Sequence, residues 1–453
     1  MQLRDLHTVY FVGIGGIGMS ALARYFAGQG IVVHGYDRTA TDLTRTLEAE
    51  GANIHYVEDV NQIPAKVDLV VYTPAVPASH KELVYFREQQ IPMMKRAEVL
   101  GLISRDRRAI AIAGTHGKTT TSSILTHLLR SAEVDCTAFL GGIAMNYGSN
   151  YVAGQSDWVV IEADEFDRSF LHLEPELAVI TSMDPDHLDI YGDHEQMLDT
   201  GFRAFAKKIR PQGSLWIQHS FEPLLNLASA KTYGIDHGSV RASGVHVADG
   251  HFVFDYQDER GTLQALKFPL PGRHNVENAT AALAIARTLG AEESALRHGL
   301  ESFRGIRRRF ELIYRDGQTV FFDDYAHHPR ELEAAIGAAR ELFPEREITG
   351  IFQPHLYSRT RDFAEGFAQA LDKLDRVILL DIYPAREEPI PGVDADLIRS
   401  YMTSDQVLRG TKEQIPDLLG NDVPEVLLTL GAGDISDRVQ PIKAFLESRK
   451  AMV

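Results

Sequence analysis

The feature that most constrains the fold of this chain is the glycine- and threonine-rich segment Gly114-Thr115-His116-Gly117-Lys118-Thr119-Thr120. It follows a continuous apolar run at residues 109–113 and precedes a helical run that reaches residue 130. A loop between a strand and a helix points backbone N–H groups at an anion, and the helix dipole adds to the attraction. The segment therefore predicts a nucleotide-phosphate site, with Lys118 supplying positive charge and the Thr119 hydroxyl available to Mg²⁺. Because Ile112 stands where the usual G-x-x-x-x-G-K-[ST] pattern begins with glycine, we expect a shorter variant of that loop.

Acidic segments follow two further apolar runs of the same region. Residues 162–167 come after the run at 158–161, and residues 184–189 come after the run at 177–180. The carboxyl ends of parallel strands share one edge of a sheet, and open α/β sheets bind ligands at that edge. We expect Glu162 to serve as a metal ligand there, since magnesium prefers oxygen donors. His187 fits either an ordinary turn residue or a ligand of a second divalent ion.

A second glycine turn lies near the N-terminus, where Gly13, Gly15, Gly16 and Gly18 satisfy G-x-G-x-x-G after a β-rich run. Asp37 follows the next apolar run at about the distance expected of a ribose-binding acid. Taken alone, the turn predicts an NAD-dependent dehydrogenase. Glycine backbones recognise the pyrophosphate and not the nicotinamide, however, so a UDP-linked substrate here and ATP at the downstream loop account for both motifs.

The alternation of strand-like and helical runs predicts an α/β protein with parallel sheets. A length of 453 residues is typical of about three domains. The polar segment 104–108 and the start of a new α/β pattern near residue 310 indicate the boundaries. We expect a Rossmann-like domain at 1–104, a P-loop-type ATPase domain at 105–311 and a second Rossmann-like domain at 312–453.

Composition narrows the classes of partner. A formal net charge of -17 argues against a broad nucleic-acid surface, which would need an excess of Lys and Arg. No apolar run approaches the ~20 residues of a membrane span. The N-terminal residues lack the basic and apolar regions of a signal peptide, so we expect a cytoplasmic protein.

The motifs in their order resemble those of the Mur ligase family of peptidoglycan synthesis, over essentially the whole chain. The carriers are GIGGIGMS (13–20), GTHGKTTT (114–121), EADEFDRSFL (162–171), DPDHLDIY (184–191), GRHNVENATAA (272–282), DDYAHHP (323–329), FQPHLYSRTRDF (352–363) and YPAREEPIPG (383–392).

The resemblance implies roles for particular residues. Lys118 and Thr119 would hold the ATP phosphates and Mg²⁺, with two metal ions expected and Glu162 and His187 as further ligands. Contacts to ATP from later in the chain would come from His274, Asn278, Arg308 and Asp324. The amino-acid pocket and the transferring phosphate would be served by His327, His328, Arg359 and Arg361.

The resemblance also implies the reaction. The carboxylate of UDP-N-acetylmuramate would attack the γ-phosphate of ATP, and the amine of L-alanine would displace phosphate from the acyl phosphate. Either His327 or His328 would serve as the base for the amine. Two alternatives stay open: a ligase that adds a tripeptide to the same sugar nucleotide, and a nucleotide-switched binding protein without ligase chemistry. Several relatives carry a lysine about 15 residues after the histidine at 187; here the region reads Asp199-Thr200-Gly201-Phe202, so no carbamate bridge is expected.

Overall fold

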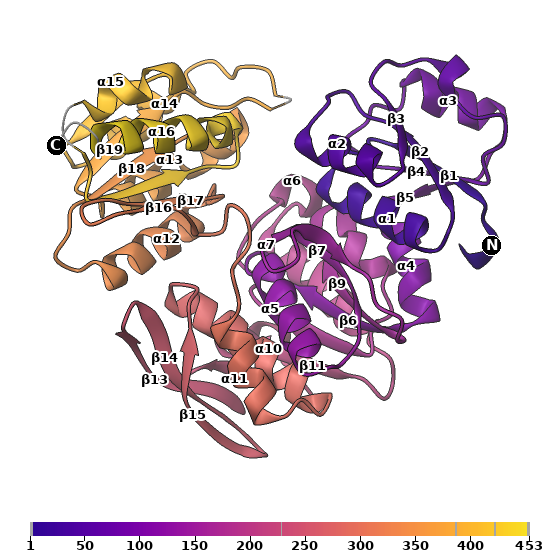
Figure 1. The fold of residues 1–453 in the computed structure, drawn as a ribbon, viewed down its shortest axis with the longest axis horizontal. Helices are drawn as coiled ribbons and strands as arrows, with labels where there is room; N and C mark the ends of the chain where they lie inside the picture. The colour runs from indigo at the N-terminus through magenta and orange to yellow at the C-terminus, as the bar shows by residue number, and fades with distance from the viewer. Residues whose placement is uncertain (1–2, 228, 386, 421–422, 451–453) are drawn as a thin grey trace. The chain divides into compact units, whose positions relative to one another are not determined.

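The computed structural model describes residues 3–227, 229–385, 387–420 and 423–450. Strands of these residues form three sheets, and most of the paired strands run parallel (Figure 1). The predicted α/β class is therefore confirmed. The contacts between residues group the chain into two compact units. They do not test the three predicted domains, whose boundaries stay predictions. The first unit comprises Met1–Ser243, Asp255–Leu266 and Glu277–Phe303, and the second comprises Gly244–Phe254, Lys267–Val276 and Arg304–Val453.

The first sheet has the strand order β3-β2-β1-β4-β5, with parallel pairing throughout. Its strands are β1 (Thr8–Val12), β2 (Val32–Tyr36), β3 (Asn53–His55), β4 (Leu69–Tyr72) and β5 (Met93–Lys95). The helices of this region are α1 (Ile17–Gly28), α2 (Asp42–Ala49), α3 (Lys81–Glu88) and α4 (Arg96–Asp106). The strand order reverses at β1, and the crevice at such a switch point is where α/β sheets bind ligands. The first glycine turn begins directly after β1.

The second sheet has the order β15-β14-β13-β12-β11-β10-β6-β9-β7-β8. Its strands are β6 (Arg108–Ala113), β7 (Thr137–Ala144), β8 (Ser149–Val152), β9 (Trp158–Ala163), β10 (Leu177–Ile180), β11 (Ser214–Gln218), β12 (Lys231–Ile235), β13 (Val240–Ala248), β14 (His251–Asp258) and β15 (Gly261–Phe268). Strand β6 lies between β9 and β10, and Ala113 is in register with both Ala163 and Ile180. The segments that follow these three strands therefore meet at one edge, as the sequence predicts.

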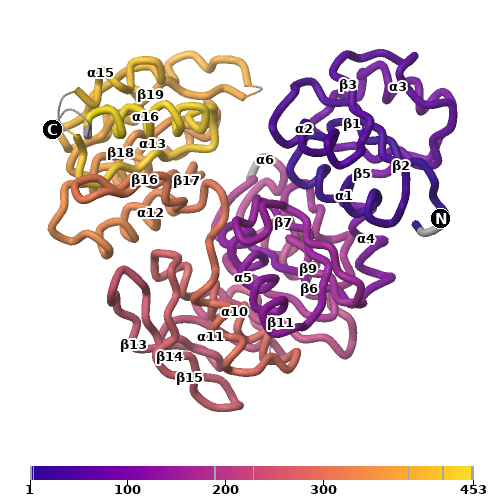
Figure 2. The backbone as a smooth tube through the Cα atoms, in the orientation of Figure 1, coloured from indigo at the N-terminus to yellow at the C-terminus, as the bar shows by residue number. Residues whose placement is uncertain are grey.

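Helices and irregular turns connect the strands of the second sheet or follow its last strand. They are α5 (Lys118–Ser131), the 3-10 helix η3 (Phe166–His172), α6 (Leu188–Tyr191), α7 (His194–Gln196), the π-helical turn η4 (Met197–Arg203), α8 (Ala204–Ala206), α9 (Glu222–Leu225), α10 (Arg273–Thr288) and α11 (Glu293–Glu301). The long strands β13, β14 and β15 lie side by side in Figure 1 and in the backbone trace of Figure 2. Residues 215–265, to which the sequence assigned no chemistry, thus extend the sheet.

The third sheet has the order β16-β17-β21-β18-β19-β20, in which β16 is antiparallel to β17 and the other pairs are parallel. Its strands are β16 (Glu311–Arg315), β17 (Val320–Asp324), β18 (Ile348–Phe352), β19 (Arg376–Leu380), β20 (Val407–Gly410) and β21 (Val426–Leu430). The helices are α12 (Pro329–Leu342), α13 (Tyr357–Leu371), α14 (Ala395–Tyr401), α15 (Ile415–Leu419) and α16 (Val439–Lys450).

The polar segment 104–108, where the sequence predicts a domain boundary, is regular secondary structure for most of its length. Helix α4 runs to Asp106 and β6 begins at Arg108, so the segment is the last turn of a helix and the start of a strand. Ile103 and Ser104 are buried, and the Ser104 hydroxyl donates to the Gly101 carbonyl. The buried face of α4 ends at Ser104, and the charged residues 105–108 that follow are exposed or half-buried. Across the described residues, no helix combines the length and apolar character needed to cross a bilayer.

Candidate functional site

The phosphate loop owes its shape to two glycines with positive φ angles. Gly114 has φ 133° and Gly117 has φ 84°, a region that L side chains rarely adopt. A Cβ at Gly114 would lie 2.2 Å from Thr181 Oγ1, and one at Gly117 would lie 2.7 Å from Asn278 Oδ1. Both positions therefore require glycine for conformation and for space.

Hydroxyl groups that follow β10 brace the same loop. Ser182 Oγ lies 2.9 Å from Thr115 Oγ1 and accepts the backbone N–H of His116 at 2.7 Å. Thr119 and Thr120 open helix α5 and are buried. The loop is thus a rigid, braced turn at a helix N-terminus, the backbone arrangement that binds phosphate.

Lys118 points its ammonium across the loop. Its Nζ donates to the Gly114 carbonyl at 2.7 Å and to Glu165 Oε2 at 2.7 Å. Burial lowers the pKa of Lys118, but the carboxylates around it, Glu165 foremost, raise the pKa more, so the lysine stays charged. The sequence motif did not single out Glu165, because the carboxylate reaches Lys118 only through the pairing of β6 with β9.

Thr119 and Glu162 converge on the other side of the loop. The Thr119 hydroxyl donates to Glu162 Oε1 at 3.0 Å, and Glu162 Oε2 accepts the backbone N–H of Gly141 at 2.8 Å. A Cβ at Gly141 would come within 2.3 Å of Glu162 Oε1, so this glycine leaves the room that the carboxylate occupies. Gly141 is a site residue that the sequence reasoning missed.

His187 lies beside these acids. Its Nε2 is 3.6 Å from Glu165 Oε1 and 3.7 Å from Asp186 Oδ2. Among the described residues, no group of three or more His, Cys, Asp and Glu side chains forms a ready-made metal cage. Magnesium needs few protein ligands when phosphates and water complete its octahedron, so Thr119 and Glu162 still fit it.

A cavity of about 300 Å³ joins the first glycine turn to this acidic edge. Gly16 and Gly18 line one part of it, and Gly141 and Glu162 line another. Arg96, the first residue of α4, also lines the cavity and lies 3.5 Å from Asp164 Oδ2. The sequence reasoning passed over Arg96, which has no motif around it and reaches the cavity only because α4 packs beside α1.

Asp37 contacts the glycine turn itself. Its Oδ2 accepts the backbone N–H of Gly15 at 2.8 Å, and its Oδ1 accepts that of Thr39 at 3.1 Å. Gly13 and Gly16 close the turn through the Gly16 N–H, which donates to the Gly13 carbonyl at 3.3 Å. The turn is therefore ordered by its own acid, and it leads into the N-terminus of α1.

His274 and Asn278, two of the residues predicted to contact ATP, lie one turn apart on α10. Asn278 is buried, and its Oδ1 accepts the Thr121 hydroxyl at 3.1 Å beneath Gly117. His274 is exposed at the first turn of the helix. Asn278 thus packs against the phosphate loop, whereas His274 is open to solvent and belongs to the second compact unit.

Arg308 and Asp324 also belong to the second unit. Arg308 has φ 61°, and its Nε donates to Asp323 Oδ2 at 3.2 Å. Asp324 accepts the backbone N–H groups of Phe310 at 2.6 Å and Ala326 at 2.7 Å. Burial raises the pKa of Asp324 to about 6. These contacts hold both side chains in place at the carboxyl end of β17.

The adjacent histidines of this unit have different environments. His327 Nδ1 lies 3.0 Å from the Tyr325 carbonyl, which can only accept, so a neutral His327 carries its proton on Nδ1 and a lone pair on Nε2. Burial lowers the pKa of His327, against the opposing effect of Glu331, so the neutral form prevails near pH 7. His328 instead caps α12 through Nδ1, which accepts the Arg330 N–H at 3.4 Å.

Arg359 and Arg361 are two residues apart on α13 and therefore lie on different faces of that helix. Arg361 is exposed, and its Nε donates to Asp362 at 2.7 Å. The charge of Arg359 helps to lower the pKa of His327. Of the two arginines, Arg359 therefore influences the charge of His327, and Arg361 is exposed and paired with Asp362.

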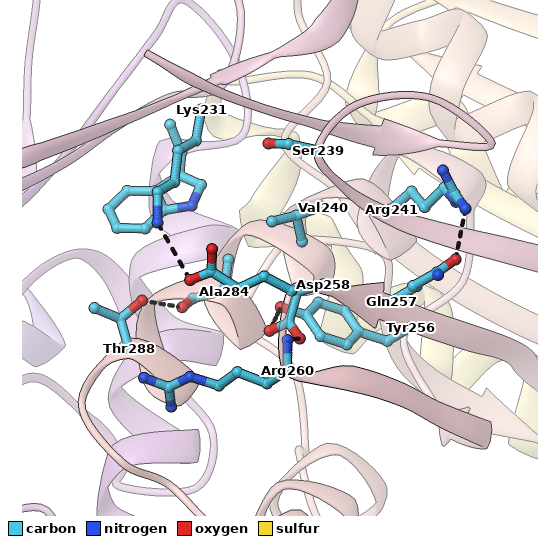
Figure 3. A pocket seen from close by; sticks show the side chains of 12 residues that line it. Lys231, Ser239, Val240, Arg241, Tyr256, Gln257, Asp258, Arg260, Ala284 and Thr288 are labelled. Carbon is cyan, nitrogen blue, oxygen red and sulfur yellow. Dashed lines mark hydrogen bonds and ion pairs between the residues drawn. The ribbon is translucent and has the colours of Figure 1, made fainter. Parts of the chain in front are cut away.

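A second cavity, of about 440 Å³, is lined by residues such as Lys231, Arg241 and Arg260 (Figure 3). It lies in the first unit at the amino ends of β12 and β13, whereas the phosphate loop follows the carboxyl end of β6. Its cations already have partners in the chain. Lys231 lies 3.8 Å from Glu259, and Arg241 donates to Gln257 at 2.6 Å, while the Arg260 guanidinium contacts the carbonyl of Arg287. Only the partner of Lys231 carries an opposite charge, since Arg241 and Arg260 contact neutral groups.

Three models of the Mur ligase family match successive parts of the chain: the catalytic domain at residues 8–108, the middle domain at 112–286 and the glutamate ligase domain at 308–433. The UDP-N-acetylmuramate–L-alanine ligase of Porphyromonas gingivalis is 49% identical over 98% of this chain and 100% of its own length. The enzyme of the same name from Flavobacterium johnsoniae is 46% identical over 98% of this chain and 99% of its own length.

A solved structure of UDP-N-acetylmuramate-alanine ligase from Thermotoga maritima superposes with a TM-score of 0.84 at 28% identity, covering 98% of this chain and all of that one. A murein peptide ligase from Psychrobacter arcticus shares the fold with a TM-score of 0.70 at 23% identity, over 97% and 98% of the two chains. These findings do not favour the dehydrogenase alternative. The chain belongs to the Mur ligase family.

Proposed function

We propose that this chain joins L-alanine to UDP-N-acetylmuramate with the hydrolysis of ATP to ADP and phosphate. The observation that carries the proposal is the cavity between the glycine turn and Glu162, because it connects a diphosphate-binding turn to the acids of the phosphate loop. Full-length relatives named for this reaction, at 44–49% identity, support it.

The sugar nucleotide is assigned to the cavity. Its diphosphate lies on the turn Gly13–Gly18 at the N-terminus of α1, where backbone N–H groups and the helix dipole favour an anion. Arg96 adds a cation at the same wall. The lactyl carboxylate then extends toward Gly141 and Glu162, on the side of the phosphate loop.

ATP is assigned to the loop at residues 114–120. The loop backbone holds the phosphates, and Lys118 neutralises charge that develops during transfer. Thr119 and Glu162 would hold Mg²⁺, and His187 is the candidate ligand of a second ion. The metal, when bound, offsets the negative charge of the phosphates and orients them.

In the reaction, a carboxylate oxygen forms a bond to the γ-phosphorus while the bond from that phosphorus to the bridging oxygen of ADP breaks. The amine of L-alanine attacks the acyl carbon, and phosphate leaves. His327 is the better candidate for accepting the amine proton, because its neutral Nε2 carries a lone pair, whereas His328 is committed to capping α12.

Phosphate release from ATP tests the proposal. We expect release to require UDP-N-acetylmuramate and L-alanine together, with L-alanine exceeding glycine, L-serine and the tripeptide in kcat/KM. A higher kcat/KM for the tripeptide would instead identify the chain as a ligase that adds the tripeptide to UDP-N-acetylmuramate. Reduction with borohydride in the absence of an amine should trap the acyl phosphate as an alcohol; nucleotide binding without any trapped product would indicate a switch protein.

A further inference from the structure

Glu165 is the most deeply buried acid near the phosphate loop, and the reaction scheme above assigns it no role. Its side chain is 1% exposed, two residues beyond the end of β9. Oε2 accepts the Lys118 ammonium at 2.7 Å. Oε1 is buried without a hydrogen-bond partner among the described residues and lies 3.6 Å from His187 Nε2.

The backbone around Glu165 is held in an unusual conformation. Asp167 and Arg168 have φ angles of 52° and 54°, which non-glycine residues rarely adopt. Lys95 Nζ donates to Asp167 at 3.0 Å, and the Arg168 guanidinium lies 4.9 Å from the Tyr191 ring centroid. Tyr191 also donates its hydroxyl to the Glu165 carbonyl at 2.7 Å. Contacts from two other segments, at Lys95 and at Tyr191, thus fix a turn that would otherwise relax, which is typical of functional sites.

The geometry separates the tasks of the two glutamates at this edge. Glu162 contacts the Thr119 hydroxyl and the Gly141 N–H, on the side assigned to the metal. Glu165 contacts Lys118, whose ammonium also donates to the Gly114 carbonyl. A long, flexible lysine side chain is thereby restricted to one position before any nucleotide arrives, and a charge fixed in advance needs no reorganisation in the transition state.

We propose that Glu165 is a positioning residue, whose buried carboxylate holds the Lys118 ammonium beside the Gly114 carbonyl, ready for the transferring phosphate. The inference rests on the proposed function in that ATP is the ligand of the loop. Glu165 acts through Lys118 and does not itself touch the phosphate.

The test compares three substitutions by steady-state kinetics and by calorimetric binding of ATP with Mg²⁺. Glu165→Gln keeps the size of the side chain and one acceptor oxygen but removes the charge that restrains Lys118. We expect kcat to fall about 10- to 100-fold, while KM and Kd for ATP change less than about threefold, because the lost interaction is made in the transition state. Glu165→Asp retains the charge and should recover at least about fivefold of the lost kcat.

Glu176→Gln is the matched control. Glu176 pairs with Arg108 at the opposite end of β6, at 2.9 Å and 2.5 Å, so this variant removes a paired carboxylate far from the loop. Its kcat should stay within about twofold of the wild-type value. If Glu165→Gln does not fold, Tyr191→Phe, which releases the Glu165 backbone, should lower kcat in the same direction with the ATP Kd unchanged.

Two results would overturn the inference. One is a Glu165→Gln enzyme with wild-type kcat. The other is an equal loss of kcat and ATP affinity that Glu165→Asp does not relieve, which would make Glu165 only a structural counter-ion. A wild-type protein that binds ATP but releases no phosphate with both substrates would refute the proposed function instead.

Discussion

The glycine turn after β1 and the phosphate loop after β6 both lead from a buried parallel strand into the N-terminus of a helix, and they differ in the side chains that surround them. The loop contains Lys118 and Thr119, and Glu162 and Glu165 contact these residues from the end of β9. Residues 13–18 of the glycine turn carry no charged side chain, and Asp37 is bonded to the backbone of the turn.

This difference separates holding a phosphate from transferring one. The diphosphate of a sugar nucleotide keeps its charge during phosphoryl transfer, so backbone N–H groups and a helix dipole hold it equally in the ground state and in the transition state, which lowers KM without raising kcat. A lysine and a metal that meet charge as it develops can raise kcat. The glycine turn is therefore suited to anchoring a diphosphate, and the loop to transferring a phosphoryl group.

The largest effect should come from Lys118→Ala. We expect kcat to fall roughly 10²- to 10³-fold, because the cation assigned to the transferring phosphate is lost. The variant should also unfold at a lower temperature, since Glu165 would be left as a buried, uncompensated charge. Phosphate-release assays and thermal melting measure the two effects. Lys207→Ala, at an exposed position, serves as the control. If both variants were equally active, the phosphate loop would have no role in catalysis.

Gly141→Ala should have the next largest effect. The new Cβ would lie 2.3 Å from Glu162 Oε1, so the carboxylate must move away from Thr119. We expect activity to fall about 10- to 100-fold and the Mg²⁺ concentration for half-maximal activity to rise, because loss of a group that positions a metal ligand typically has this effect. Gly28→Ala, on α1 where a Cβ meets open space, is the control. An unchanged Mg²⁺ requirement would argue against Glu162 as a metal ligand.

Gly15→Ala tests whether the glycine turn serves only to bind the sugar nucleotide. Its Cβ would approach Asp37 Oδ2 to 2.8 Å and Thr44 Cγ2 to 2.7 Å, so the turn must distort. We expect KM for UDP-N-acetylmuramate to rise about tenfold with kcat changed less than about threefold, because uniform binding is lost. At Gly16 a Cβ meets only ordinary contacts, and Gly16→Ala should melt like the wild type. A pure kcat defect in Gly15→Ala would contradict the anchoring role.

The smallest effect should come from Glu331→Gln, which tests proton transfer by His327. Neither the glycine turn nor the phosphate loop takes part in that proton transfer. Glu331 raises the pKa of His327 against the lowering caused by burial. Glu331→Gln removes the negative charge, so the His327 pKa should fall and the acidic limb of the pH–kcat profile should move roughly half to one unit lower. The control is Glu333→Gln, a substitution on the same helix as Glu331 that breaks the exposed ion pair between Glu333 and Lys373. It should leave the profile unchanged. An unchanged limb in Glu331→Gln would exclude His327 as the base.

Much of the fold follows from local patterns. The loop at 114–120 and the helix α5 that follows it could be predicted because glycines and apolar runs act on their own neighbours in the chain. The end of α4 could not, since the burial of Ile103 and Ser104 depends on packing that the charges at 105–108 obscure. The roles predicted for the site residues remain to be tested by the experiments above.

The amino-acid sequence by itself determined that a strand enters a glycine loop with Lys118, that a second glycine turn precedes it, and that acids follow the neighbouring strands. Only the tertiary structure decided that Glu165 holds Lys118, that Gly141 leaves space for Glu162, that Arg96 reaches the cavity, and that His328 caps a helix while His327 keeps a free lone pair in its neutral form. The physical reason is distance along the chain. Glycine conformation and helix polarity are local properties, whereas the contact of one side chain with another 47 residues away depends on strand register and helix packing.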